Sequence, residues 1–295
     1  MKGIILAAGK GTRLYPMTKP ICKPLLPVYD KPLLYYPLSV LQQAGIRDVL
    51  IIVPPDDTEP FVRLLGDGSQ LGMNIQYIEQ KVQRGIADAF VVGEQFIGDD
   101  DVCLILGDNI FYGDGFENQL AQAMEIERGG GAVIFGYYVE HPEAFGVVEF
   151  GANGEAISIE EKPAKPKSNY IVPGLYFYDN RVVQIAKRLQ PSARGELEIT
   201  SVNNTYLELG ELNVVKLNPS FTWLDAGTED SLLQAAVTIQ RLRTATGVSV
   251  GCIEEYALKN GWIDAEQVRR LADGMRNTKY GDYLLERAER KANKE

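Results

Sequence analysis

The sequence has little histidine and little cysteine, which restricts its chemistry. Its 295 residues include one histidine, His141, and three cysteines. His141 precedes a proline in a polar stretch and is interpreted as a surface residue, so we expect neither a histidine-dependent triad nor a multi-histidine metal site. The cysteines have no metal-ligand spacing and cannot all pair, which favours a reducing, cytoplasmic compartment. Cys22, beside Lys23, is interpreted as a bystander rather than a reactive thiol.

Long apolar runs and excess positive charge are also missing. No apolar run reaches the ~18 residues that cross a membrane, and the first residues do not resemble a signal peptide, so we expect no membrane partner. The formal charge of −10 argues against nucleic acid, for which a basic patch is expected. An acidic protein that binds anions must gather cations at its site, which makes Arg13, Lys23 and Lys162 informative.

The two common phosphate-binding loops are absent, although the chain opens on a glycine-rich stretch, KGIILAAGKGTRLYPMTKPICKP. It contains no G-x-x-x-x-G-K-[ST] run, and Leu14 stands where the dinucleotide fingerprint has its third glycine. Gly9 and Gly11 let the backbone turn sharply and present N–H groups to an anion. Arg13 can bind phosphate oxygens bidentately, and Lys23 adds a point charge. The stretch predicts a triphosphate cradle after the first strand; composition alone leaves an ordinary turn open.

Strand and helix patterns alternate through the first half. Apolar runs such as VLIIV and VCLIL suit central parallel strands buried on both faces. The expected strands are Gly3–Ala8, Asp48–Val53, Ile75–Ile78 and Val102–Leu106. The expected helices are Leu33–Ala44, Glu59–Leu65, Ile86–Phe96 and Gly115–Arg128. This order predicts an α/β fold with a doubly wound, mostly parallel mixed sheet of Rossmann-like type.

The second half is richer in strand patterns and predicts a lobe that closes a cleft. The expected strands are Ala132–Val139, Gly146–Phe150, Ala156–Glu161, Leu175–Tyr178 and Asn213–Lys216. The expected helices are Arg181–Leu189, Glu196–Leu209 and Thr228–Thr244, the last with Thr228 as N-cap. We therefore predict a main domain (1–245) with halves 1–130 and 131–245, and a small C-terminal helical appendage (246–295).

Two aspartates follow apolar runs and are candidates for a metal site. Asp108 ends VCLILGD and should emerge at the carboxyl edge of a central strand, and Asp225 lies in WLDAG before an expected helix. Magnesium prefers oxygen ligands and takes one or two carboxylates from a protein. The residues alone leave open that Asp108 is a turn residue and that Asp225 caps a helix.

The pattern L-A-A-G-x-G-T-R-L-x-P, followed by K-P-L-L-P, resembles the sugar-1-phosphate nucleotidylyltransferases. Further motifs resemble one branch of them, the glucose-1-phosphate thymidylyltransferases, and the resemblance covers nearly the full chain. These motifs are PVYDKPLLYYPLS (27–39), LGDGSQLG (65–72), LGDNIFYG (106–113), EKPAKPKSNY (161–170), GLYFYDN (174–180), PSARGELEIT (191–200), WLDAGT (223–228), NGWIDAEQ (260–267) and YGDYLLER (280–287).

The resemblance implies an enzyme that transfers a thymidylyl group from dTTP to α-D-glucose 1-phosphate. It implies Mg²⁺ as cofactor, in-line attack with release of pyrophosphate, and a product, dTDP-glucose, that leads to dTDP-rhamnose and other deoxysugars of cell-surface polysaccharides. It also implies a cytoplasmic homotetramer with allosteric feedback by a downstream sugar nucleotide.

The resemblance also implies roles for individual residues. The catalytic residues would be Arg13, Lys23, Lys162, Asp108 and Asp225, the two aspartates as metal ligands. The nucleotide would be bound by Leu6, Ala8, Gly9, Gly11, Thr12, Arg13, Lys23, Gln80, Gly85 and Asp108. The sugar would be bound by Asn109, Gly146, Glu161, Lys162, Val172 and Tyr176. Without the resemblance, Asn109, Gly146, Val172 and Tyr176 would each be interpreted as a packing or turn residue. The adjacent Glu161 and Lys162 would be interpreted as a solvated surface pair.

The base-reading segment departs from the branch. Thymidylyltransferases typically carry Q-P-S-P-D-G-L-A-Q-A-F, whereas residues 80–90 are QKVQRGIADAF. Gln80 and Gly85, expected to face the pyrimidine, are retained, but the two prolines and the aspartate of the motif are replaced. A missing methyl contact discriminates by only ~1–3 kcal/mol, so an enzyme that uses UTP, alone or beside dTTP, is an alternative. Another alternative is a catalytically silent regulatory subunit that binds a sugar nucleotide. The retained Arg13, Lys23, Asp108 and Asp225 argue against it.

Overall fold

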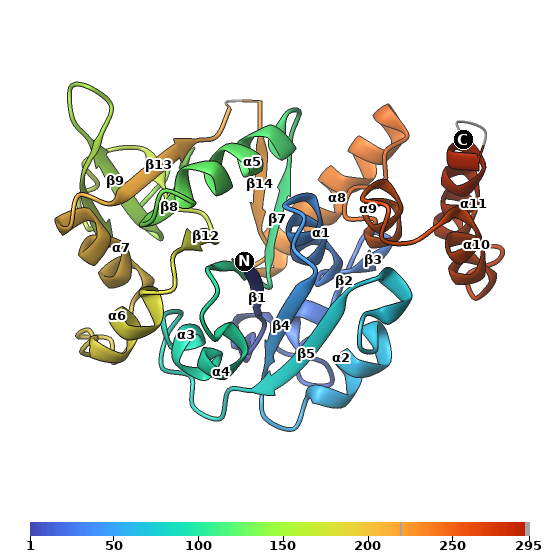
Figure 1. The fold of residues 1–295 in the computed structure, drawn as a ribbon, viewed down its shortest axis with the longest axis horizontal. Helices are drawn as coiled ribbons and strands as arrows, with labels where there is room; N and C mark the ends of the chain where they lie inside the picture. Colours follow the sequence, from blue (N-terminus) through green and yellow to red (C-terminus); the bar gives the residue numbers. More distant parts are fainter. Residues whose placement is uncertain (219, 293–295) are drawn as a thin grey trace.

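A ten-stranded mixed sheet forms the centre of the molecule (Figure 1). The computed structural model describes residues 1–218 and 220–292. The strand order is β10-β9-β11-β8-β12-β6-β1-β4-β5, with β13 beside β8. The sheet strands are β1 Lys2–Leu6, β4 Asp48–Val53, β5 Asn74–Glu79, β6 Val102–Leu106, β8 Ala132–Tyr138, β9 Gly146–Phe150, β10 Ala156–Glu161, β11 Tyr170–Ile171, β12 Leu175–Tyr178 and β13 Leu212–Lys216. Two short ribbons lie outside it, β2 Pro27–Val28 with β3 Lys31–Pro32, and β7 Asn109–Tyr112 with β14 Thr222–Asp225.

The first half of the chain builds the parallel part of the sheet, as predicted. Strand β1 pairs in parallel with β4 and β6, and β4 pairs in parallel with β5. Successive residues of β1 face opposite sides, so Ile5 packs in one core cluster and Ile4 in the other, and both are fully buried. Burial on both faces explains why these strands read as continuous apolar runs.

Helices cover both faces of the sheet. The clusters join α1, α2 and α5 to one face and α3, α6 and α7 to the other. The helices are α1 Tyr35–Gln43, α2 Thr58–Leu65, α3 Asp88–Val92, α4 Glu94–Ile97, α5 Phe116–Glu127, α6 Val182–Arg188, α7 Ile199–Glu208, α8 Glu229–Thr246, α9 Ile253–Lys259, α10 Ala265–Asp273 and α11 Lys279–Ala292. The predicted doubly wound, mostly parallel mixed sheet is therefore confirmed. None of these helices is both long and apolar enough to span a bilayer within the described residues.

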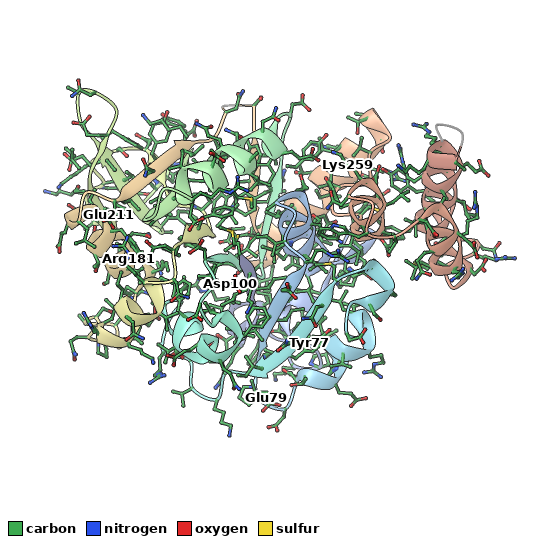
Figure 2. All side chains as sticks on the ribbon, viewed as in Figure 1. Tyr77, Glu79, Asp100, Arg181, Glu211 and Lys259 are labelled. Atoms are coloured by element: carbon green, nitrogen blue, oxygen red, sulfur yellow. The ribbon has the colours of Figure 1, made fainter. Side chains whose placement is uncertain are left out.

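The second half adds antiparallel strands. Strand β12 runs antiparallel to both β6 and β8, and β9, β10 and β11 extend that edge through antiparallel pairs. Arg181 pairs with Glu211 and so links the start of α6 to the start of β13 (Figure 2). The strand-rich lobe that the sequence predicts is present.

The C-terminal helices lie at the opposite end of the molecule from β9 (Figure 1). Helix α8 begins with the predicted cap, since the Thr228 hydroxyl accepts from the Ser231 backbone N–H in a capping box. Lys259 of α9, labelled in Figure 2, forms an ion pair with Glu117 of α5 and so connects the appendage to the main body. Residues 293–295 of the predicted appendage lie outside the described residues, and the domain division stays a prediction.

Several expected elements are wrong in their bounds. The first strand ends at Leu6 rather than Ala8, and the expected helix 86–96 is two short helices, α3 and α4. The break falls at Gly93, where a Cβ would lie 2.9 Å from the Ala89 carbonyl and 3.0 Å from Ile4 of β1, so only glycine fits at this contact with the sheet. The ribbon strands β7 and β14 were not predicted, because their pairing joins segments far apart in the sequence.

Candidate active site

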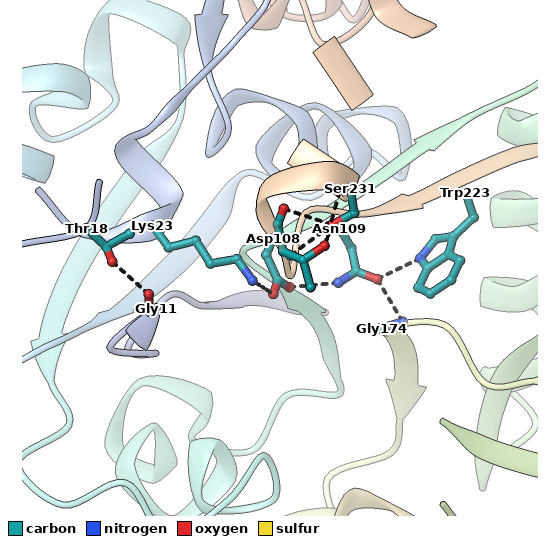
Figure 3. A network of polar contacts seen from close by, with 9 residues as sticks. Gly11, Thr18, Lys23, Asp108, Asn109, Gly174, Trp223 and Ser231 are labelled. Carbon is teal, nitrogen blue, oxygen red and sulfur yellow. Dashed lines mark hydrogen bonds and ion pairs between the residues drawn. The ribbon is translucent and has the colours of Figure 1, made fainter. Parts of the chain in front are cut away.

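The loop after β1 folds back on the segment that carries Lys23. Gly11 has a left-handed backbone (φ +59°), and a Cβ there would lie 3.1 Å from side-chain atoms of both Lys23 and Thr18. The Thr18 hydroxyl donates a 2.7 Å hydrogen bond to the Gly11 carbonyl (Figure 3). A short 3-10 turn follows, in which Leu14 is fully buried while Arg13 stays exposed. Gly11 is therefore required for the close approach that puts Arg13 and Lys23 beside one cavity.

That cavity has a volume of about 320 Å³ and opens at the carboxyl ends of β1 and β6. The predicted residues that line it are Leu6, Gly9, Gly11, Thr12, Arg13, Lys23, Asp108 and Asp225. Ala7, Pro24, Leu106, Gly107 and Gly227 complete the lining and were not predicted. Carboxyl ends of parallel strands are the usual ligand-binding edge of such sheets.

The ribbon of β7 and β14 brings the two candidate metal ligands together. In its register, Asp225 pairs with Asn109, and the Ala226 N–H donates to the Asp108 carbonyl at 3.1 Å. Lys23 Nζ forms an ion pair with Asp108 Oδ2, and Asn109 Nδ2 donates to Asp108 Oδ1 at 2.8 Å (Figure 3). The Asp108 carboxylate is therefore held between a cation and an amide.

The electrostatics of the pair suit a divalent cation. Burial raises the pKa of Asp225 to about 6, and the neighbouring Asp108 carboxylate acts in the same direction. A cation shared by both carboxylates would favour their ionised forms. No cluster of three or more His, Cys, Asp or Glu ligands occurs among the described residues. Two carboxylates completed by phosphate oxygens and water are a donor set that magnesium takes, so the residues present fit this metal.

A second cavity, of about 260 Å³, adjoins the first on the side of the antiparallel lobe. All six residues predicted to bind sugar line it: Asn109, Gly146, Glu161, Lys162, Val172 and Tyr176. Arg13, Leu106, Asp108 and Asp225 line both cavities. The two cavities therefore meet at one cation and two carboxylates.

Glu161 and Lys162 both reach the second cavity although they are neighbours in sequence. Adjacent residues of a regular strand face opposite sides. Strand β10 ends at Glu161, and Lys162 has a left-handed backbone (φ +46°), which breaks the alternation. Glu161 Oε2 accepts from the Thr200 hydroxyl at 2.6 Å, and Lys162 Nζ lies 3.8 Å from Glu161 Oε1. The pair is therefore part of the cavity wall rather than an isolated surface pair.

Sequence reasoning missed Arg194, a further cation of the second cavity. Its Nη1 lies 3.7 Å from Glu161 Oε1, and its Nε lies 3.3 Å from Glu198 Oε1. The motif PSARGELEIT carries the only signal, an arginine set among acidic residues. Trp223 was missed as well; its indole N–H donates to Asn109 Oδ1 at 2.7 Å, which also accepts from the Gly174 N–H (Figure 3).

Three residues predicted to bind nucleotide lie outside the linings of these two cavities. Ala8 and Gln80 are buried, and the Gln83 carboxamide donates to the Ala8 carbonyl. Gly85 has φ +107°, and a Cβ there would lie 2.5 Å from the Leu197 carbonyl. The segment that was predicted to contact the base is therefore packed tightly against the chain that leads into α7.

Comparison with known proteins gives the family. Residues 2–241 match the family model described as nucleotidyl transferase. A Neisseria meningitidis serogroup A protein named glucose-1-phosphate thymidylyltransferase is 55% identical over 97% of this chain and 98% of its own length. A Mycobacterium tuberculosis H37Rv protein of the same name is 55% identical over 98% of this chain and its full length.

Solved structures agree with this grouping. A Bacillus anthracis protein described as a glucose-1-phosphate thymidylyltransferase, crystallised with sucrose, superposes with a TM-score of 0.74 at 42% identity, over 81% of this chain and 94% of that one. A UDP-glucose pyrophosphorylase with UDP-glucose superposes with a TM-score of 0.71 over 82% of this chain and 99% of that one, and its 23% identity shows the shared fold alone. The chain is therefore an enzyme of the nucleotidyl transferase family, in the branch formed by the glucose-1-phosphate thymidylyltransferases.

Proposed function

We propose that this enzyme transfers the thymidylyl group of dTTP to α-D-glucose 1-phosphate with the help of magnesium. One observation carries the proposal beyond the names of the relatives: two adjoining cavities meet at Asp108 and Asp225. Arg13 and Lys23 line the first cavity, and Lys162 and Arg194 line the second. Two phosphorylated substrates could therefore meet with their phosphates at the junction.

In the proposed reaction, a phosphate oxygen of glucose 1-phosphate attacks the α-phosphorus of dTTP. The new O–P bond forms as the bond from the α-phosphorus to the bridging oxygen of pyrophosphate breaks in line with it. The attacking oxygen is already anionic, so no general base is needed, and the exposed His141 has no part to play. Such chemistry depends on alignment and on stabilisation of developing charge.

Four cations would share this work. Arg13 would neutralise the charge that develops on the leaving pyrophosphate, and Lys23 would bind the triphosphate. Lys162 and Arg194 would hold the attacking phosphate from the other side. Asp108 and Asp225 would hold magnesium, which when bound neutralises charge on the nucleotide phosphates.

The remaining assignments belong to the same proposal. Glu161, whose carboxylate accepts from the Thr200 hydroxyl, would accept from sugar hydroxyls as well. Gln80 and Gly85 would face the pyrimidine. We also propose a cytoplasmic homotetramer with allosteric feedback, and a product that leads to dTDP-rhamnose and other deoxysugars; these rest on the family resemblance. Use of UTP, alone or beside dTTP, is the second candidate, because the base-reading segment departs from the branch.

The test is pyrophosphate release with glucose 1-phosphate and each of dTTP, UTP, GTP, CTP and ATP, with and without magnesium. We expect release that requires magnesium and is fastest with dTTP. Equal or faster release with UTP would change the assignment to a uridylyl-transferring or dual enzyme. Silence with every nucleotide would overturn the catalytic proposal and favour a sugar-nucleotide-binding subunit.

A further inference from the structure

A buried carboxylate lies directly behind the residue proposed to face the base. Asp88 is 1% exposed at the first position of α3. Its Oδ1 accepts from Arg84 Nη2 at 2.7 Å, and its Oδ2 accepts from Gln80 Nε2 at 2.8 Å. Gln80 is itself 3% exposed. A buried carboxylate is costly unless it is paired and hydrogen-bonded, and these two contacts supply both.

The chemistry of Asp88 leaves the Gln80 carboxamide only one orientation. An ionised carboxylate can only accept hydrogen bonds, so it can bond the NH₂ group of Gln80 and repels its oxygen. An amide or hydroxyl in the place of Asp88 could donate or accept, and either end of the carboxamide would fit. Because Gln80 donates to Asp88 through Nε2, Oε1 is the end of the carboxamide that does not bond this carboxylate. That oxygen therefore remains available as an acceptor.

Two backbone hydrogen bonds to Leu197 hold the segment that carries Arg84 and Asp88. The Ala87 N–H donates to the Leu197 carbonyl at 3.1 Å, and the Leu197 N–H donates to the Arg84 carbonyl at 2.5 Å. Positions 84 and 88 are also two of the places where the chain departs from the typical pattern of the branch, which has aspartate at the first and glutamine at the second.

We propose that Asp88, supported by Arg84, is a positioning residue that fixes the Gln80 carboxamide for a base with an N3–H donor. Thymine and uracil present N3–H beside a carbonyl oxygen. The N3–H can donate to the amide oxygen of Gln80, and the carbonyl oxygen can accept from its amide N–H. Cytosine presents an N3 acceptor beside an amino donor and suits the same amide only when it is turned over. The locked orientation selects keto pyrimidines against cytosine. This inference rests on the proposed function, because it requires Gln80 to face the base.

The test compares dTTP with dCTP by steady-state pyrophosphate release in Asp88→Asn, Arg84→Ala and wild-type enzyme. Asp88→Asn keeps the size of the side chain but can both donate and accept, so the carboxamide can turn over. We expect the dTTP-to-dCTP ratio of kcat/KM to fall about tenfold, through KM rather than kcat. Arg84→Ala should lower the ratio about threefold. Arg63→Ala, which removes an exposed cation of α2 outside this segment, should leave the ratio unchanged.

The outcomes separate this inference from the proposed function. If wild-type enzyme uses dTTP and the ratio does not change in Asp88→Asn, the inference is overturned and the proposed function stands. An equal loss of kcat with both nucleotides would show a structural role and overturn it as well. If Asp88→Asn does not fold, the half-exposed Arg84→Ala decides, and an unchanged ratio there overturns the inference. Wild-type enzyme that uses no pyrimidine nucleotide would sink both.

Discussion

The two cavities are built from the same sheet but in different ways. Most of the first is lined by residues 6–24, which are nearly contiguous in the chain, together with the turn after β6. The second collects residues from β10, β12, β14 and the loop before α7. Parallel strands deliver their following loops to one edge, so a local motif can build a site there. Antiparallel strands place side chains by register, so the second site depends on pairing between distant segments.

The largest effect is expected from a change to Arg13, which lies where the two cavities meet. Arg13→Ala should lower kcat by at least ~100-fold, since it removes a charge that stabilises the transition state. Lys10→Ala, which removes an exposed cation from the same loop, is the matched control and should stay near wild-type rate. Single-turnover pyrophosphate release measures both. A well-folded Arg13→Ala enzyme with near-normal rate would remove Arg13 from the chemistry.

The second test asks whether Asp108 and Asp225, where the two cavities meet, bind one magnesium ion together. Asp225→Asn should lower turnover roughly 100-fold and raise the magnesium concentration needed for half-maximal rate, because one of the two carboxylate ligands is lost. The measurement is the rate of pyrophosphate release as a function of magnesium concentration. A chelator should abolish the rate, and excess magnesium should restore it. Asp230→Asn, an exposed carboxylate of the first turn of α8, is the control. An unchanged magnesium dependence in Asp225→Asn would contradict a shared ion.

The third test separates the cavities by substrate. Arg194→Ala should raise the KM for glucose 1-phosphate by about 10- to 100-fold, since a contact between a charged donor and phosphate is lost, and should change the KM for dTTP much less. Lys165→Ala, an exposed cation beyond β10, should change neither. If Arg194→Ala raised only the KM for dTTP, the assignment of the two cavities would have to be exchanged.

The smallest expected effect on activity comes from a residue that lines neither cavity. Glu127 is 1% exposed at the end of α5, and both its carboxylate oxygens lack hydrogen-bond partners among the described residues. Burial raises its pKa to about 7, and Asp101 and Asp179 add to the shift. Ionising this group costs more in the folded than in the unfolded chain. Stability should therefore decline as pH rises from about 4.5 towards 7, and stay lower above 7.

Glu127→Gln removes this cost. The variant should be more stable than wild type by about 1–3 kcal/mol at pH 8, with a smaller difference at pH 5. Urea unfolding at the two pH values measures it, and both KM values should stay unchanged. Glu125→Gln, an exposed neighbour on the same helix, is the control. Equal stability of Glu127→Gln and wild type at pH 8 would show that the buried carboxyl is compensated.

Features that depend on neighbouring residues were predicted from the sequence, and features that depend on contacts between distant segments were missed. The central strands were predicted correctly in type, because burial on both faces leaves continuous apolar runs. Thr228 was predicted correctly as a helix cap, because capping depends on a few neighbouring residues. Arg194 was missed, since its importance comes from its position beside Glu161, which is distant in sequence. The close contact of Gly93 with β1 was missed for the same reason, since Ile4 is distant from it in sequence.

The sequence by itself determined the glycine-rich loop with Arg13 and Lys23, the buried parallel strands, and an aspartate at the end of β6, because each follows from local pattern and backbone chemistry. Tertiary structure alone placed Asp225 beside Asp108, through the pairing of β7 with β14. It also turned Lys162 to the same cavity as Glu161 and set Asp88 behind Gln80. These arrangements depend on strand register, on the positive φ angle of Lys162 and on burial, which are set only when distant segments pack together.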